Sequence, residues 1–113
     1  PIADMSAKDV RLSVSSMLMV AADEYAIGIQ NGEVTNVHEY QDAMGFKEIA
    51  LERLNRINDK EAEKAEEAIS ETSKVISNLE NLWPTTTPEG EFEGDPSKIY
   101  GAASRIELEA RSI

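Results

Sequence analysis

The stretch of residues 18–46 constrains the fold of this chain most, because it places one tight break between two segments with helical periodicity. Apolar residues recur at three- and four-residue spacing on both sides, which is the pattern of helices that bury one face. Between them, Asn31 and Gly32 form a strong helix-stop signal, since both residue types accept the left-handed conformation that ends a helix. The sequence therefore predicts two long helices, over residues 6–30 and 36–57, joined by a tight connection.

Each of these helices carries a Glu-Tyr pair close to the connection, with Glu24 and Tyr25 before it and Glu39 and Tyr40 after it. If the helices are antiparallel and the turn is centred near Glu33, Tyr25 lies about level with Tyr40, and Glu24 lies close to Glu39. Two carboxylates and two phenols would then meet at one helix–helix seam. Such a meeting suits either a cation site or a polar layer of an ordinary bundle, and the sequence leaves both open.

Two further helices are predicted after this pair. The third, over residues 60–83, keeps alternating three- and four-residue apolar spacing up to Trp83, which is typical of a bundle helix. Pro84 ends it, residues 84–95 form a loop rich in helix breakers, and the fourth helix covers residues 97–112. The expected N-caps are side chains that accept hydrogen bonds from a first turn, namely Ser6, Thr35 or Asn36, Asp59 and Asp95.

A single domain is what the length allows, since 113 residues support one hydrophobic core rather than two. We expect residues 1–113 to form one all-α domain, an up-and-down four-helix bundle. The chain starts at Pro1 with neither an initiator Met nor a signal-like apolar segment, as expected of a piece of a longer chain or of a mature form.

Charge and composition argue against several classes of function. The 22 acidic residues against 11 basic ones give a net charge of −11, which argues against nucleic acid or an anionic membrane as a partner. No apolar run approaches the ~20 residues that cross a bilayer, so direct membrane insertion is not expected. Without cysteine, the chain lacks the attachment motif of c-type haem. It also has no nucleotide-type glycine loop and no nucleophile paired with a base, so we expect no haem, no nucleotide and no enzymatic activity.

The carboxylates nearest the connection are the first candidates for a metal site. On helical wheels, Glu24 and Glu39 lie at the edges of the two apolar faces, and carboxylates on facing helices are how bundles hold hard cations and iron. Tyr25 and Tyr40 would then orient these carboxylates by hydrogen bonding. The alternative is that Lys47, which points into the second apolar face, pairs with Glu24 or Glu39 while the phenols reach the rim of the bundle.

His38 and Asp42 lie four residues apart and therefore point the same way, on the polar side of the second helix. They form a weak surface site that Asp23 would complete, or else His38 is a bystander on a solvated face. Because His38 is the only histidine, the Glu-x-x-Glu pair of Glu63 and Glu66 is not expected to form a buried di-iron centre. The candidate metal ligands are therefore the side chains around the connection: Glu24, Glu39, Asp23, Tyr40, Tyr25, His38 and Asp42.

Three short motifs flank the connection: Asp-x-Tyr, Gly-x-Val and Glu-Tyr, followed by an apolar helix. They are here Asp23-Glu24-Tyr25, Gly32-Glu33-Val34 and Glu39-Tyr40, with Phe46 in the helix. This pattern, over about residues 12–57, resembles the extracytoplasmic helical domain of bacterial iron permeases, of the type that precedes the membrane permease, often with a cytochrome c module. The chain lacks the Arg-Glu-x-x-Glu iron motif of the permease portion.

The resemblance implies a periplasmic location and a role in iron uptake, with a membrane permease or a cytochrome c module as partner. Its carried-over site residues are Asp23, Glu24, Glu39 and Tyr40. The function it favours is a non-enzymatic accessory domain that binds or relays iron, or another divalent cation, through acidic side chains. The alternative is a structural or protein-interaction bundle without a metal site, which binds a partner or forms a homodimer through exposed apolar groups such as Phe92 or Trp83.

Overall fold

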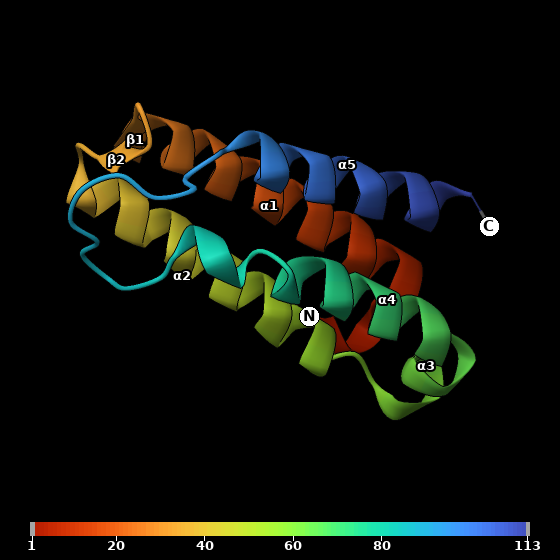
Figure 1. Cartoon of the computed structure of the whole chain (residues 1–113). Helices are drawn as coiled ribbons and strands as arrows, with labels where there is room; N and C mark the ends of the chain where they lie inside the picture. The colour runs from red at the N-terminus through yellow and green to blue at the C-terminus, as the bar shows by residue number, and fades with distance from the viewer. Residues whose placement is uncertain (1, 113) are drawn as a thin grey trace.

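The computed structural model describes residues 2–112, which form helices that run alternately up and down a bundle 46 Å long (Figure 1). The helical elements are η1 (Ile2–Asp4), α1 (Ala7–Gly28), α2 (Val37–Asn55), α3 (Asp59–Lys64), α4 (Glu66–Ser77), η2 (Glu80–Leu82) and α5 (Ser97–Arg111). The architecture is the predicted all-α, up-and-down bundle, with α3 and α4 together in the place of the third helix. Among the described residues, no helix is both long enough and apolar enough to cross a membrane.

The connection between α1 and α2 is a β-hairpin rather than a plain helix–helix turn. Strands β1 (Ile29–Gln30) and β2 (Glu33–Val34) pair antiparallel, with Ile29 opposite Val34. Asn31 and Gly32 occupy the turn with φ of 54° and 78°, the two positive values that favour Asn-Gly in two-residue hairpins. The predicted left-handed backbone is therefore confirmed, but Asn31 and Gly32 form the hairpin turn and do not end α1, whose last residue, Gly28, lies three residues before Asn31.

Two of the predicted N-caps are confirmed. Ser6 and Asn36 each accept a hydrogen bond from the backbone N–H three residues on, at 3.1 and 3.3 Å. Asp95 accepts from the backbone N–H of Ser97 at 2.9 Å, but the N-cap position of α5 is occupied by Pro96. The predicted cap at Asp59 is wrong, because Asn58 has the extended backbone of a cap and accepts from the first turn of α3 at 2.9 Å.

The third helix differs most from the prediction of one helix over residues 60–83. The chain leaves helical geometry at Ala65, where φ is −124° and ψ is 27°, and α4 ends at Ser77. No residue of α3 is fully buried, and only Ala62 packs partly against the core, so little tertiary packing holds this segment in line with α4. After α4 the backbone tightens into η2, which brings Leu82 and Trp83 into the core.

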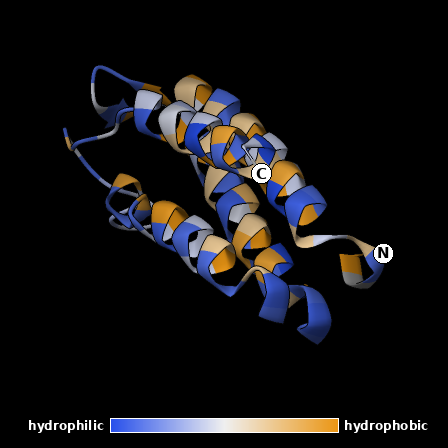
Figure 2. Cartoon of the chain, turned by 90° about the vertical axis from the view of Figure 1, so that its right-hand side faces the viewer, coloured by the Kyte–Doolittle hydropathy of each residue, from blue (hydrophilic) through white to orange (hydrophobic). Residues whose placement is uncertain are grey.

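The core lies along α1, which packs mainly against α2 and α5, while α4 closes the remaining side (Figures 1 and 2). The fully buried side chains of α1 repeat at helical spacing and include Val10, Val14, Leu18 and Tyr25. Near the hairpin the two helices approach closely at Gly28, where an added Cβ would lie 2.8 Å from the backbone nitrogen of Tyr40. This approach sets the position of the first turn of α2 against α1.

Candidate functional site

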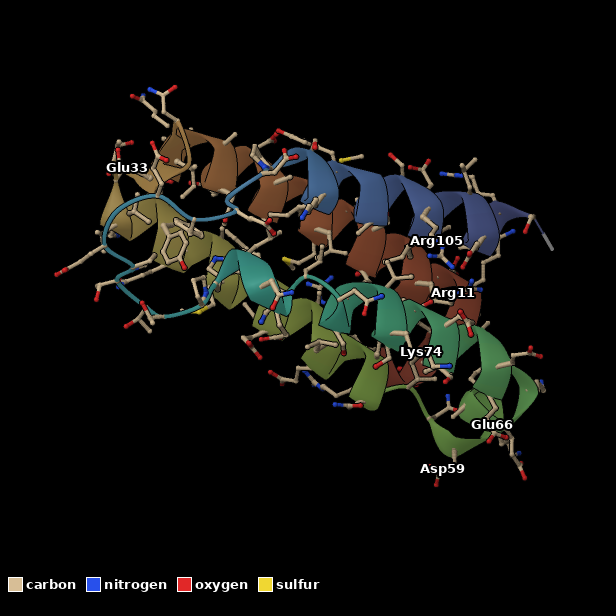
Figure 3. All side chains as sticks on the ribbon, viewed as in Figure 1. Arg11, Glu33, Asp59, Glu66, Lys74 and Arg105 are labelled. Carbon is tan, nitrogen blue, oxygen red and sulfur yellow. The ribbon has the colours of Figure 1, made fainter. Side chains whose placement is uncertain are left out.

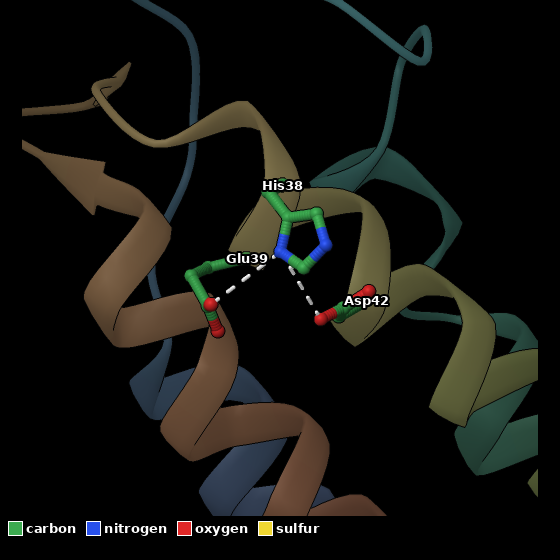
Figure 4. A group of neighbouring side chains, drawn as sticks. All are labelled: His38, Glu39 and Asp42. Carbon is green, nitrogen blue, oxygen red and sulfur yellow. Dashed lines mark ion pairs between the residues drawn. The ribbon is translucent and has the colours of Figure 1, made fainter.

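Three ligand-type side chains meet at the first two turns of α2, as Figure 4 shows. The Nδ1 atom of His38 lies 3.6 Å from Oε1 of Glu39 and 3.5 Å from Oδ2 of Asp42. One potential ligand atom from each residue lies within 4.8 Å of the other two. Among the described residues, this is the group of three such side chains that could hold a metal ion.

Local structure fixes where this group sits. The backbone N–H groups of Thr35 and Asn36 both donate to the carbonyl of Gly28, at 2.9 and 3.2 Å, which ties the start of α2 to the end of α1. The Asn36 side chain caps the helix through the N–H of Glu39. The i, i+4 spacing then places Asp42 one turn beyond His38, on the same side.

The geometry suits a cation. Ligand atoms bound at ~2.0–2.2 Å from a metal lie roughly 2.8–3.6 Å apart at octahedral or tetrahedral angles. The separations around His38 therefore need little adjustment. One imidazole with two carboxylates is a mixed donor set that accepts first-row cations such as iron, copper or zinc.

The group is open to solvent. The side chain of His38 is 81% exposed, that of Asp42 45% and that of Glu39 24%. A cation held here keeps several coordination positions for water or for another protein's ligands. Without a cation, the same contacts are surface ion pairs of His38, which contribute little to stability.

The two tyrosines are confirmed as neighbours across the helix seam, with ring centroids 5.8 Å apart. Their hydroxyls, however, donate to backbone carbonyls of η2 and of the loop after it: Tyr25 to Leu82, the last residue of η2, at 2.7 Å, and Tyr40 to Thr85 in the loop at 2.8 Å. These bonds stand in place of the predicted bonds to carboxylates. Burial raises the pKa of Tyr40 to about 12 and raises that of Tyr25 further, so both phenols stay protonated at neutral pH and are poor metal ligands.

The carboxylates of α1 lie apart from the cluster. Asp23 accepts a hydrogen bond from the Tyr100 hydroxyl at 2.5 Å and so joins α1 to α5, whereas the sequence suggested that it would complete the His38 site. Glu39 occupies that third position instead. Glu24 is half-buried, and its carboxylate is not part of the group. The helical-wheel prediction placed Glu39 at the seam, facing Glu24, and therefore did not group it with His38 and Asp42.

Lys47 is buried, and its partners differ from the predicted ones. Its ammonium group lies 2.7 Å from Glu80 and 2.8 Å from Glu48 and 5.3 Å from the ring centre of Trp83. The predicted pairing with Glu24 or Glu39 is therefore wrong. Sequence reasoning missed Glu80 because η2, which carries it, was taken as the last turn of a continuous helix. Burial lowers the pKa of Lys47, but the hydrogen bonds and charges of the two glutamates outweigh burial and leave the pKa raised.

Comparison with known proteins gives one finding. A family model described as the iron permease-associated 4-helix bundle domain matches residues 3–113. No curated protein and no solved structure matches the chain. The family match confirms the resemblance seen around the hairpin and extends it from under half of the chain to nearly all of it.

Proposed function

The chain belongs to the family of iron permease-associated 4-helix bundle domains, and we propose that it is a non-enzymatic, periplasmic accessory domain that binds iron, or another divalent cation, and passes it toward a membrane permease. The observation that carries the cation-binding part is the group of His38, Glu39 and Asp42, whose potential ligand atoms converge within 4.8 Å. The net charge of −11 supports it, because an acidic surface raises the local concentration of cations.

The surroundings of the cluster favour cations as well. Phe92 N–H donates to the carbonyl of Gly32 at 2.9 Å, so the acidic loop that contains Glu91 and Glu93 lies beside the hairpin, at the same end of the bundle as the cluster. Glu33 extends from the hairpin at that end (Figure 3). A cation that approaches this end meets carboxylates from three segments of the chain.

The exposure of the cluster favours transfer over storage. Three protein ligands on a solvated helix face leave the cation accessible, and no buried layer around them excludes water. Such a site binds moderately and exchanges readily. Those properties suit a domain that hands a cation to a partner, for which a membrane permease or a cytochrome c module are the candidates.

The interaction-bundle alternative has less support from its proposed contact groups. Trp83 is 6% exposed, donates its indole N–H to the carbonyl of Tyr40 at 3.1 Å and belongs to the core. Phe92 is half-buried and packs edge-on against the Tyr40 ring, with centroids 6.2 Å apart. Both aromatic groups therefore serve the fold rather than an open binding face.

The proposal is tested by calorimetric titration of the metal-free protein with ferrous ion under anaerobic conditions, and with ferric, cupric and zinc ions. We expect binding of one of these ions that is lost in His38→Ala/Asp42→Ala. Glu63→Ala/Glu66→Ala is the matched control, because it removes two exposed carboxylates from α3 and α4. It should leave the affinity almost unchanged. Binding should also weaken in acid, since imidazole binds a metal only in its neutral form.

A separate variant, Glu24→Ala, distinguishes the cluster from the helix seam. Loss of binding in Glu24→Ala with full binding in His38→Ala/Asp42→Ala would move the site to the seam. Equal weakening in every variant, the control included, would show only diffuse attraction of cations to an acidic protein. No specific heat with any ion would contradict the cation-binding function.

A further inference from the structure

A pocket of about 590 Å³ is lined by segments of α1, α3, α4 and α5, which meet at the end of the bundle away from the hairpin (Figure 1). It is bounded by the start of α1, by α3 and α4, and by the last turns of α5. Its volume falls within the ~300–1,000 Å³ range of small-molecule sites. Because the hairpin and this pocket occupy opposite ends of a bundle 46 Å long, the pocket is separate from the His38 cluster.

A buried guanidinium forms part of the pocket wall. Arg11 is 3% exposed, and its Nε donates to the hydroxyl of Thr72 at 3.2 Å, where α1 passes between α4 and α5 (Figure 3). No ion pair joins Arg11 to any residue in the described part of the chain, 2–112. Every fully buried side-chain nitrogen or oxygen there has a hydrogen-bond partner. The Nη groups of Arg11, for which no partner is found among the described residues, are therefore not fully buried, and Arg11 is one of the residues that line the pocket.

The glutamates around the pocket are mostly engaged elsewhere. Glu61 accepts from the backbone N–H of Ala7 at 2.9 Å and lies 3.6 Å from the ammonium group of Lys64. Glu71 pairs with Lys74 at 3.7 Å, and Glu109 with Arg105 at 3.0 Å. Glu67 also lines the pocket, but no ion pair joins it to Arg11 among the described residues. The guanidinium of Arg11 is therefore left without an anionic partner.

A buried charge without a counterion is costly, because the desolvation of the ion is not offset by a nearby opposite charge. An anion that enters the pocket would supply that charge. A carboxylate matches the planar fork of a guanidinium, with which it forms two parallel hydrogen bonds.

The remaining wall selects among anions. Ala7, Ala65, Ala68 and Ala110 give it an apolar surface, which suits the hydrocarbon part of an organic acid. Its four glutamates outnumber its three basic residues, Lys8, Arg11 and Lys64, so the lining opposes a dianion such as phosphate more than a monoanion. We propose that this pocket binds a small organic monocarboxylate, with its carboxylate on Arg11 and its apolar part against the alanines.

The test follows the side-chain Nε–Hε signal of Arg11 by NMR while hexanoate is added to the whole domain. We expect this signal to shift with saturation at a dissociation constant of about 1 mM or below. Inorganic phosphate at equal ionic strength should shift it much less. An Arg11 signal that does not respond to hexanoate, or that responds as strongly to phosphate, would overturn the proposal.

Two variants show whether the response comes from the pocket. Ala68→Phe fills the pocket but keeps the Ala68 carbonyl that accepts from Thr72 at 2.8 Å, so the fold should persist while hexanoate binding falls at least about tenfold, which corresponds to ~1.4 kcal/mol. Arg56→Gln removes an exposed guanidinium whose partner, Glu52, also lies outside the pocket lining, and this variant should bind hexanoate like the unaltered protein. Unchanged binding in Ala68→Phe, or a comparable loss in Arg56→Gln, would contradict the proposed site.

Discussion

The replacement of Gly28 by alanine tests how closely α1 and α2 approach near the hairpin. The added Cβ would lie 2.8 Å from the nitrogen of Tyr40, 3.1 Å from its Cα and 3.1 Å from the carbonyl oxygen of Asn36. All three are backbone atoms of the second helix or its cap, so relief requires α2 to move rather than a side chain to rotate. We therefore expect Gly28→Ala to destabilise the domain.

The magnitude follows from two opposing terms. Alanine is better than glycine in a helix by about 0.5–1 kcal/mol, a gain that is smaller at the last residue of α1. Overpacking at a close contact typically costs about 1–3 kcal/mol. The net effect should be a loss of about 1–2 kcal/mol in the free energy of unfolding. Urea denaturation followed by circular dichroism measures this loss as a lower midpoint with an unchanged m-value.

Gly101→Ala supplies the matched control. Gly101 lies within α5, and no atom comes within 4 Å of the Cβ that would be added there. The same chemical change should therefore stabilise the domain by about 0.5–1 kcal/mol, which is the opposite sign. If Gly28→Ala also stabilised the domain, the close backbone approach inferred here would be refuted. A destabilised Gly28→Ala should also bind cations less well, because the first turn of α2 carries His38 and Glu39.

Two further predictions concern the buried polar groups of the seam. Tyr25→Phe should lower the free energy of unfolding by about 1–3 kcal/mol, since it leaves the Leu82 carbonyl without its donor. Tyr100→Phe should cost less, because the hydroxyl of Tyr100 is on the surface. Equal losses of stability in the two variants, measured by urea denaturation, would contradict this. Stability should also fall with alkali. The pKa values of Tyr25, Tyr40 and Lys47 are all raised in the folded state, so the unfolded chain releases these protons first. Their contribution is complete below pH ~10 and is lost as pH rises toward the folded values. Urea denaturation between pH ~8 and ~11 measures this loss, and a stability that holds constant or increases above pH ~10 would disprove it.

Local signals account for much of what the sequence predicted. Helix periodicity, the caps at Ser6 and Asn36, and the Asn31-Gly32 turn each depend on a few neighbouring residues, and the structure contains all of them. The level placement of Tyr25 and Tyr40 followed from the same local geometry, since an antiparallel pair with a short connection has a fixed register. The motifs beside the connection likewise indicated the family.

The third helix shows where local signals stop being sufficient. Its apolar spacing continues through Ala65, yet the helix breaks there, because α3 has no fully buried residue and its contacts with the rest of the bundle are few, such as the bond from Ala7 N–H to Glu61. The spacing of side chains reports which face of a helix can be buried. It does not report whether a partner is present to bury it.

The sequence by itself determined the helical class, the break between the first two helices, most helix starts and the residue types available for a cation site. Only the tertiary structure decided that Glu39 joins His38 and Asp42, that Lys47 pairs with Glu80, and that Arg11 lies in the wall of a pocket. The bonds from Lys47 to Glu80 and from Arg11 to Thr72 join residues 33 and 61 positions apart. Such partners depend on how helices rotate and slide against one another during packing, and a one-residue change in that register replaces every contact while it leaves the local pattern the same.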